Sequence, residues 1–183
     1  MTRPSAPRRP FMAPLATMLL LALVMLPSAV GIAASAAWNA ETRPVVGLDI
    51  QLQTQPASCG PALIAVLSTL RGRPVAEAHV LAKASMGEDG VSLAEFARLA
   101  SLHDLDGAWY RVERDRLEKL PLPYVAHLAT ADGGHYVAIV AAGGGAVVVL
   151  DPAVGAVVGP AATLLRGFSG RVFLLDGVTR RAS

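Results

Sequence analysis

The hydrophobic pattern of the chain changes period in its second half, and this change constrains the fold more than any other feature. Apolar residues recur at helical spacing over residues 60–70, and shorter helical patterns follow at 75–83 and from Gly90 onwards. After about Gly107 the pattern becomes that of strands, with a continuous β-branched run at 146–150. Helices first and strands later predict an α+β domain with segregated layers.

The two halves also show more local signals. Ser92 is predicted to cap the third helix, with Glu95 three residues later completing a capping box. An extended segment at 45–52 precedes the helices, and a charged short helix or turn is expected at 111–120. The predicted strands, which would form an antiparallel sheet, are 107–112, 124–128, 135–141, 146–150, 154–158 and 171–175.

The N-terminal segment is expected to be separate from the domain. Three arginines in the first nine residues precede an apolar stretch at 11–37, a pattern typical of a signal peptide or an N-terminal membrane anchor. The small residues at 34–36 suit a signal peptidase, whereas the apolar stretch is long enough to span a bilayer of about 30 Å. With either alternative the basic flank stays inside, so we expect export across the cytoplasmic membrane to a periplasmic or other extracytoplasmic location.

The expected boundaries are a signal peptide or anchor at 1–37, a lead-in segment at 38–50, one domain at 51–176 and a tail at 177–183. Three of the 16 basic residues and none of the 14 acidic ones precede residue 37, so the remainder carries a formal net charge of −1. No basic patch with interleaved aromatic residues is present, which argues against a nucleic-acid partner. No phosphate-binding glycine loop is present either, so a nucleotide is not expected.

Cys59 is the single cysteine of the chain, so it forms no internal disulfide and the domain must be held by its core. Cys59 immediately precedes the first predicted helix, and Pro61 suits the first turn of that helix. A thiol in this position is favoured as thiolate by the positive end of the helix dipole. Cys59 is therefore either a nucleophile or a small buried apolar residue.

A thiol nucleophile requires a base, and the base requires an orienting group. His135 opens the predicted strand before the glycine turn, and Asp151 closes the strand after it. If the turn centres on Gly143, the two residues lie directly opposite, with Cβ atoms about 5 Å apart. A slip of one residue would put them on opposite faces. The alternatives are an edge residue for His135 and a turn opener for Asp151.

An acyl-transfer site also requires a donor for the oxyanion. Gln53 and Gln55 lie six and four residues before Cys59, and either could return its amide to the sulfur beside the backbone N–H of Cys59. Spacing does not choose between them. The remaining histidines show no metal-ligand spacing, and we expect neither a metal nor another cofactor.

Several motifs in a fixed order resemble those of a known family. They are Gln53, Cys59-Gly60-Pro61-Ala62, Gly90-Val91-Ser92-Leu93, Leu122-Pro123-Tyr124-Val125-Ala126-His127, Gly134-His135-Tyr136-Val137 and Asp151-Pro152-Ala153-Val154-Gly155. Together they resemble the bacteriocin-processing cysteine peptidases, papain-like enzymes that remove leader peptides after a double glycine. The resemblance implies a papain-like fold, with Cys59 as nucleophile, His135 as general base, Asp151 as its orienting group and Gln53, not Gln55, as oxyanion donor.

The function implied is that of a cysteine peptidase that cleaves extended peptide or leader substrates, after small residues such as Gly-Gly. Most peptidases of this type are N-terminal domains of ATP-driven exporters, whereas this chain is expected to be a freestanding exported member with a membrane or exporter partner. Ser58 stands where exporter-fused members often have an acidic residue. Two alternatives remain, a non-catalytic peptide-binding domain of the same fold and an acyl transferase that uses the same Cys-His-Asp site.

Overall fold

The structure is a computed structural model that describes residues 42–131, 133–165 and 167–177. The predicted signal peptide or anchor at 1–37, the first residues of the lead-in segment and the tail after 177 lie outside the described residues. Among the helices of the described residues, none has the length and apolar character needed to cross a bilayer.

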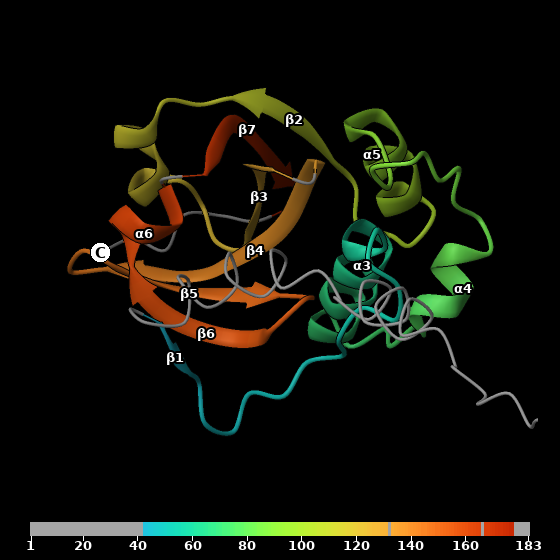
Figure 1. The fold of residues 1–183 in the computed structure, drawn as a ribbon, viewed down its shortest axis with the longest axis horizontal. Helices are drawn as coiled ribbons and strands as arrows, with labels where there is room; N and C mark the ends of the chain where they lie inside the picture. Colours follow the sequence, from blue (N-terminus) through green and yellow to red (C-terminus); the bar gives the residue numbers. More distant parts are fainter. Residues whose placement is uncertain (1–41, 132, 166, 178–183) are drawn as a thin grey trace, which may run out of the picture. The chain divides into compact units, whose positions relative to one another are not determined.

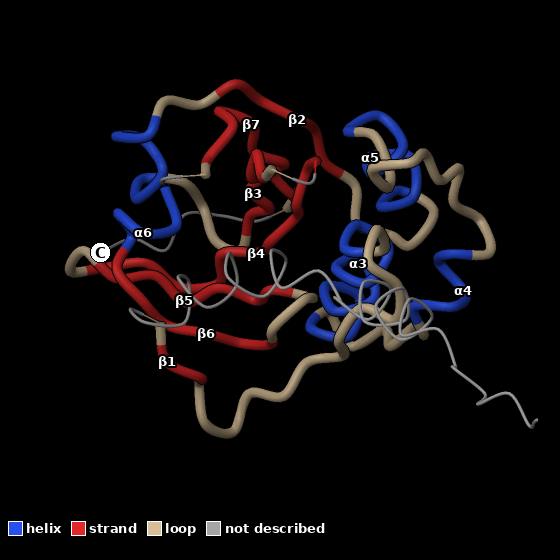
Figure 2. The backbone as a smooth tube through the Cα atoms, in the orientation of Figure 1, coloured by secondary structure: helices blue, strands red, loops and turns tan. Residues whose placement is uncertain are grey.

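In the part of the chain that the structure describes, three helices precede all but the first of the strands, as the change of period predicts, and two short helices lie between later strands (Figures 1 and 2). The helices are α3 (Cys59–Leu70), α4 (Glu77–Leu81), α5 (Leu93–Ser101), the 3-10 helix η1 (Arg114–Lys119) and α6 (Ala161–Leu165). The strands are β1 (Arg43–Pro44), β2 (Gly107–Arg111), β3 (Tyr124–Thr130), β4 (Gly133–Gly143), β5 (Ala146–Asp151), β6 (Gly155–Pro160) and β7 (Phe168–Leu175). The α+β prediction is therefore confirmed.

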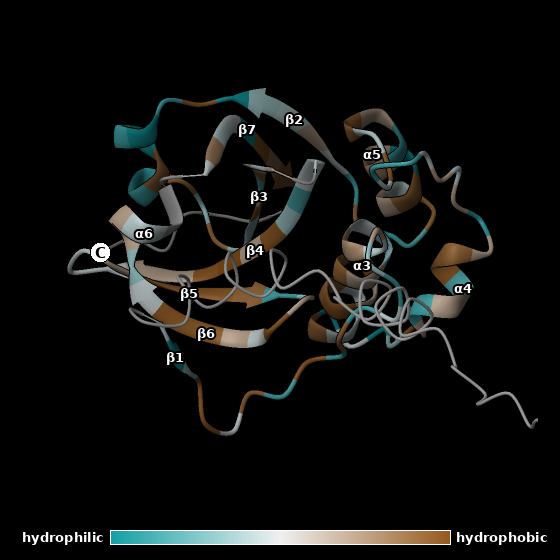
Figure 3. Ribbon diagram, in the orientation of Figure 1, coloured by the Kyte–Doolittle hydropathy of each residue, from teal (hydrophilic) through white to brown (hydrophobic). Residues whose placement is uncertain are grey.

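The strands form one antiparallel sheet in the order β1-β6-β5-β4-β3-β7-β2. Side chains alternate between its two faces, as along β4, where Tyr136 and Ala138 join the cluster that includes α3 while Val137 and Ile139 join the other. The sheet is thus apolar on both faces, and hydrophobic residues run along β4, β5 and β6 in Figure 3.

The helix α3 is more deeply buried than its apolar stripe predicts. Every residue from Cys59 to Ser68 is buried, whereas Leu70, which the stripe includes, is 49% exposed. A helix that is buried on all sides belongs to the interior of a domain. Its burial fixes the position of the residue at its N-terminus, Cys59.

An aromatic cluster joins the helices to the sheet. The ring of Phe96 on α5 stacks on Tyr136 at a centroid distance of 4.9 Å and meets Phe173 of β7 edge-on at 5.4 Å. Aromatic pairs at such distances add to the free energy gained from burial alone. Tyr136 follows His135 directly, so the cluster anchors the strand that carries the histidine.

Two local expectations differ from the structure. The segment 45–52 is not extended throughout, because a turn at Val46 and Gly47 interrupts it. The segment is held instead at its ends, where Val45 N–H donates to Ala156 at 2.9 Å and Gln53 N–H to Pro152 at 2.8 Å. The short helix α6 was not expected, because five residues are too few to establish a helical period.

Candidate active site

Cys59 is the first residue of α3, as the sequence predicts, and is 4% exposed. Its Sγ lies 4.0 Å from the backbone oxygen of Gly134, near the start of β4. The backbone N–H of Cys59 belongs to the first turn of the helix, where amides have no acceptor inside the helix. A thiol and a backbone donor are therefore combined at the positive end of the helix dipole.

The hairpin of β4 and β5 has a register different from the predicted one. Gly143 pairs with Ala146, so the turn is centred later than predicted and His135 does not stand directly opposite Asp151. Continued without interruption, this register would set Asp151 opposite Ala138, three residues from His135. Because side chains alternate along a strand, His135 would then point to the other face of the sheet.

A β-bulge between Ile139 and Ala141 restores the shared face. It shifts the pairing of β4 with β5 by one residue. Continued to the end of β5, the shifted register sets Asp151 opposite Val137. Val137 is two residues from His135, so the His135 and Asp151 side chains lie on the same face of the sheet. The contact expected between the two side chains is present, although by a different route.

The His135 imidazole donates from Nε2 to Oδ1 of Asp151 at 2.8 Å, with the side chains 19% and 6% exposed. The same Oδ1 accepts the backbone N–H of Ala153 at 2.8 Å, which fixes the carboxylate. Burial lowers the pKa of His135, but hydrogen bonds to Asp151 and Cys59, with the charges of both groups, outweigh burial and raise that pKa to about 10. Since Nε2 is taken by Asp151, Nδ1 is the ring nitrogen left for the Cys59 thiol.

Glycines let a neighbouring segment pack closely on the turn that carries the thiol. A Cβ atom on Gly60 would overlap the side chain of Val91, and one on Gly90 would come within 2.6 Å of the backbone oxygen of Ala57. Gly90 also has φ +94°, which L side chains rarely adopt. Tyr136 donates from its hydroxyl to the backbone oxygen of Val91 at 2.8 Å. The segment around Gly90 therefore forms a wall beside the candidate site.

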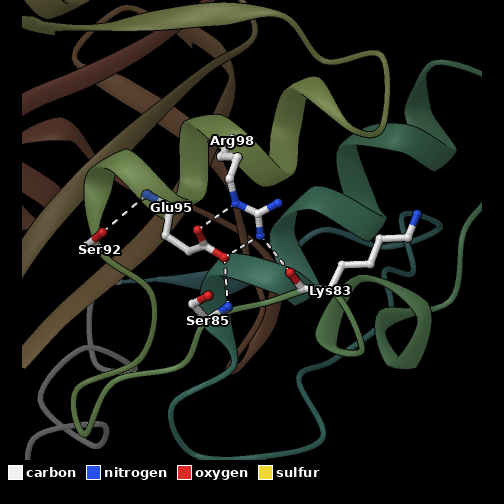
Figure 4. Close-up of polar contacts among 5 residues, drawn as sticks. All are labelled: Lys83, Ser85, Ser92, Glu95 and Arg98. Atoms are coloured by element: carbon white, nitrogen blue, oxygen red, sulfur yellow. Dashed lines mark hydrogen bonds and ion pairs between the residues drawn. The ribbon is translucent and has the colours of Figure 1, made fainter.

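A network of hydrogen bonds holds the segment 83–92, which includes Gly90, against α5 (Figure 4). Ser92 accepts the N–H of Glu95 at 3.1 Å, which confirms half of the predicted capping box. The other half is absent, because the Glu95 carboxylate instead accepts from Ser85 N–H at 2.7 Å and from Arg98 Nε at 2.8 Å. Arg98 also donates to the backbone oxygen of Lys83 at 2.6 Å. The hydrogen bond from Arg98 lowers the pKa of the Glu95 carboxyl and outweighs burial, which raises it. With the hydrogen bond from Ser85, the pKa falls to about 2.

Gln53 lies beside the turn that follows Asp151, since its backbone N–H donates to Pro152 at 2.8 Å. Its side-chain Nε2 donates to the backbone oxygens of Gln55 and Pro56, at 2.9 Å each. Its Oε1 is buried and has no hydrogen-bond partner among the described residues. A side-chain amide has two N–H groups, and both are used by these carbonyls. A donor role toward a substrate therefore requires one of the two bonds to be shared or exchanged.

A buried carboxylate that the sequence did not single out holds the same loop. Glu77, the first residue of α4, is fully buried, and its two oxygens accept the backbone N–H of Thr54 at 3.2 and 3.0 Å. Thr54 directly follows Gln53, so this contact fixes the loop before the thiol. A single glutamate at the start of a short helix has no pattern that could have identified it.

The other histidines make contacts of their own. His127 binds Ser169 Oγ through Nδ1 at 2.9 Å and meets the Tyr136 ring edge-on at 5.2 Å, whereas His79 and His103 meet edge-on at 5.9 Å. Within the described ranges, no group of three or more His, Cys, Asp or Glu side chains is placed to hold a metal ion.

A family model described as the Peptidase C39 family matches residues 48–178 of the chain. This range is more than half of the chain and includes Gln53, Cys59, His135 and Asp151. No curated protein sequence matches significantly.

Solved peptidase domains have a similar fold. A double glycine motif protease from an AMS/PCAT transporter, crystallised with the leader peptide, is 23% identical with a TM-score of 0.63, over 73% of this chain and 94% of that chain. The peptidase domain of Streptococcus ComA, described as a bi-functional ABC transporter involved in a quorum sensing pathway, is 15% identical with a TM-score of 0.63, over 70% and 96%. The N-terminal peptidase C39 like domain of a toxin secretion ATP-binding protein from Vibrio parahaemolyticus is 16% identical with a TM-score of 0.56, over 67% and 98%. The predicted papain-like fold is confirmed.

Proposed function

The chain belongs to the Peptidase C39 family, whose members are cysteine peptidases, and we propose that it hydrolyses peptide bonds through Cys59, His135 and Asp151. The observation that carries this proposal is the 2.8 Å hydrogen bond from the His135 imidazole to the buried Asp151 carboxylate, together with a thiol at a helix N-terminus that helps to raise the pKa of that imidazole. Nucleophilic catalysis requires a nucleophile, a base and an orienting group within hydrogen-bond reach of one another.

In this mechanism the Cys59 thiolate attacks the carbonyl carbon of the peptide bond. The His135 imidazolium gives its proton to the leaving amine as the C–N bond breaks, which leaves an acyl group on the sulfur. Water then attacks the thioester, the neutral imidazole accepts a proton from that water, and the thiolate leaves from the second tetrahedral intermediate. Asp151 keeps the ring oriented and stabilises its charged form throughout.

The oxyanion of each tetrahedral intermediate is stabilised by the backbone N–H of Cys59 and by the side-chain amide of Gln53. Donors aimed at a developing charge stabilise the transition state more than the ground state. Gln53 donates by sharing or exchanging one of its bonds to the Gln55 and Pro56 carbonyls when substrate arrives.

Replacing Gln53 with alanine is expected to lower kcat on the order of 10- to 1000-fold, the effect of losing one oxyanion donor. Replacing Gln55 with alanine should cost little, because within the described residues only its backbone takes part in hydrogen bonds that hold the loop. Single-turnover rates of both variants on one peptide check the assignment, with thermal melts to confirm that the loop remains folded.

A large loss for the Gln55 variant with the Gln53 variant unaffected would reverse the assignment. If neither variant loses activity, backbone groups alone form the oxyanion site.

The proposed substrate is an extended peptide with small residues before the cleaved bond, such as a double-glycine leader. The similarity to a double glycine motif protease crystallised with a leader peptide supports this choice. The test is to incubate the protein with a synthetic leader peptide and to identify both products by mass spectrometry, with Cys59→Ala as the control. Hydrolysis yields a free carboxylate on the leader fragment, whereas acyl transfer would yield an amide with an added amine. An uncleaved peptide that still binds would instead indicate the non-catalytic peptide-binding domain.

The site of action is proposed to be outside the cytoplasm, with the apolar stretch at 11–37 acting as an export signal or anchor. The partner is proposed to be a membrane transporter, since similar structures come from transporter proteins. An enzymatic reporter fused after Ser183 should be active when it requires export and inactive when it requires the cytoplasm. The mass of the mature protein separates cleavage near Ala36 from a retained anchor, and activity of the cytoplasmic reporter alone would contradict export.

A further inference from the structure

A second polar cavity lies toward the opposite end of α3 from Cys59. Its volume is about 130 Å³, and it is lined by Ser68, Arg71, Arg73, His103 and Asp104. Ser68 stands nine residues after Cys59, which corresponds to about 14 Å along a helix. The cavity is therefore distinct from the site that holds the thiol.

Ser68, one of the residues that line this cavity, has a buried hydroxyl without a hydrogen-bond partner among the described residues. Serine and threonine in a helix commonly donate to the carbonyl four residues earlier, and the neighbouring Thr69 does so with Ala65 at 2.9 Å. Ser68 is 2% exposed, yet its Oγ has no hydrogen-bond partner among the described residues. Because native proteins rarely leave a buried polar group unsatisfied, this hydroxyl points to an occupant of the cavity.

His103, which also lines the cavity, has a second unsatisfied atom. Its Nε2 is buried and has no hydrogen-bond partner within the described part of the chain. Burial, together with the positive charge of Lys83 and the nearby His79, lowers the pKa of His103 despite the opposing charge of Asp104. The ring is therefore neutral at pH 7 and can present an N–H at Nε2.

Two guanidinium groups give the lining its charge. Arg71 has no carboxylate partner among the described residues and donates only weakly, at 3.4 Å, to the backbone oxygen of Asp176. Arg73 pairs with Asp104 at 2.6 Å, but the two side chains are 65% and 71% exposed. Such exposed pairs are weak, so Arg73 can exchange Asp104 for another anion.

We propose that this cavity binds one oxyanionic group, a carboxylate or a phosphate. Ser68 and His103 donate hydrogen bonds to its oxygens, and Arg71 and Arg73 neutralise its charge. A guanidinium fork matches two oxygens of such a group, whereas two guanidinium groups would repel a cation. The cavity also exceeds the roughly 30 Å³ that one water occupies.

The test is isothermal titration calorimetry of the 183-residue protein at pH 7, with inorganic phosphate in one series and acetate in another. Saturable binding of one ion per chain is expected in at least one series, and the stronger ligand identifies whether phosphate or carboxylate is preferred. Ser68→Ala and Arg71→Gln should each weaken that binding by about tenfold or more, since each removes a bond to a charged group. Ser68→Ala loses an unpartnered hydroxyl, so it should not lower the melting temperature without ligand.

Two controls separate this site from others. Arg116→Ala removes an exposed arginine whose pair with Asp115 has the same exposure as the Arg73–Asp104 pair, 65% and 71%, and it should bind the ion as the unaltered protein does. Cys59→Ala should also bind normally, because the thiol lies at the other end of α3. The proposal is overturned if no saturable binding occurs, if Ser68→Ala and Arg71→Gln bind normally, or if Cys59→Ala or Arg116→Ala loses the binding.

Discussion

Replacing Cys59 with serine is expected to lower turnover of a double-glycine peptide by a factor on the order of 10⁴ or more, as for loss of a catalytic nucleophile. A hydroxyl is far less acidic than a thiol, so the His135 imidazole that stabilises a thiolate cannot generate the corresponding alkoxide. The measurement is the single-turnover rate of cleavage, followed by the appearance of the released fragment.

The sulfur-to-oxygen change is small, so the melting temperature should stay close to that of the unaltered protein. Cys59→Ala should show the same loss of cleavage. Retention of activity within tenfold in either variant would exclude Cys59 as the nucleophile.

The replacement of Asp151 with asparagine is expected to lower kcat on the order of 10²- to 10⁴-fold while the fold is kept. The asparagine oxygen can still accept the N–H of Ala153, but a neutral amide no longer stabilises the charged form of His135. The pKa of His135 should then fall from about 10 toward its ordinary value. A pH profile of kcat and the imidazole signals in NMR measure both effects.

The Asp151→Asn substitution should also change how the free energy of unfolding depends on pH. The pKa of His135 is raised to about 10 in the folded chain, against about 6.5 when unfolded, so its contribution is complete below about pH 6.5 and is lost as the pH rises through about 10. Urea unfolding at pH 6 and at pH 10 should therefore show a smaller pH dependence for Asp151→Asn. Asp115→Asn, at an exposed pair, is the matched control. Equal kcat and equal pH dependence in the Asp151 variant and the unaltered protein would contradict the orienting role.

The order of helices and strands could be predicted from the sequence because it depends on hydrophobic period, which is a local property. The position of Cys59 at a helix N-terminus could be predicted for the same reason, from the start of the apolar pattern. The conformation of the segment 45–52 could not be predicted in this way. Its alternating apolar residues are compatible both with an extended segment and with an irregular one that is held by hydrogen bonds at its ends.

The contact between His135 and Asp151 was expected, but its register was not. The turn is centred after Gly143, and only the bulge before Ala141 returns the two side chains to one face. A bulge depends on how neighbouring strands pack and has no signal in a run of Ala, Val and Ile. Two errors, in the turn and in the unbroken pairing, therefore compensated each other.

The hydrogen-bond partners of side chains that contact other segments of the chain could not be predicted from the sequence either. Glu95 satisfies the spacing of a capping box, yet its carboxylate accepts hydrogen bonds from Ser85 and Arg98 instead. The burial of Glu77 and the bonds of Gln53 to the Gln55 and Pro56 carbonyls are likewise set by loops that fold against α3 and α4.

The pairing of Cys59 with His135 is tested most directly by the rate at which iodoacetamide alkylates the protein between pH 5 and pH 9. Cys59 is the single cysteine, so the signal has one source. A thiolate held by an imidazolium predicts fast alkylation that persists to pH 6, and a marked loss of rate at pH 6 in His135→Ala. A rate like that of an ordinary thiol, rising with pH and unchanged by His135→Ala, would contradict it.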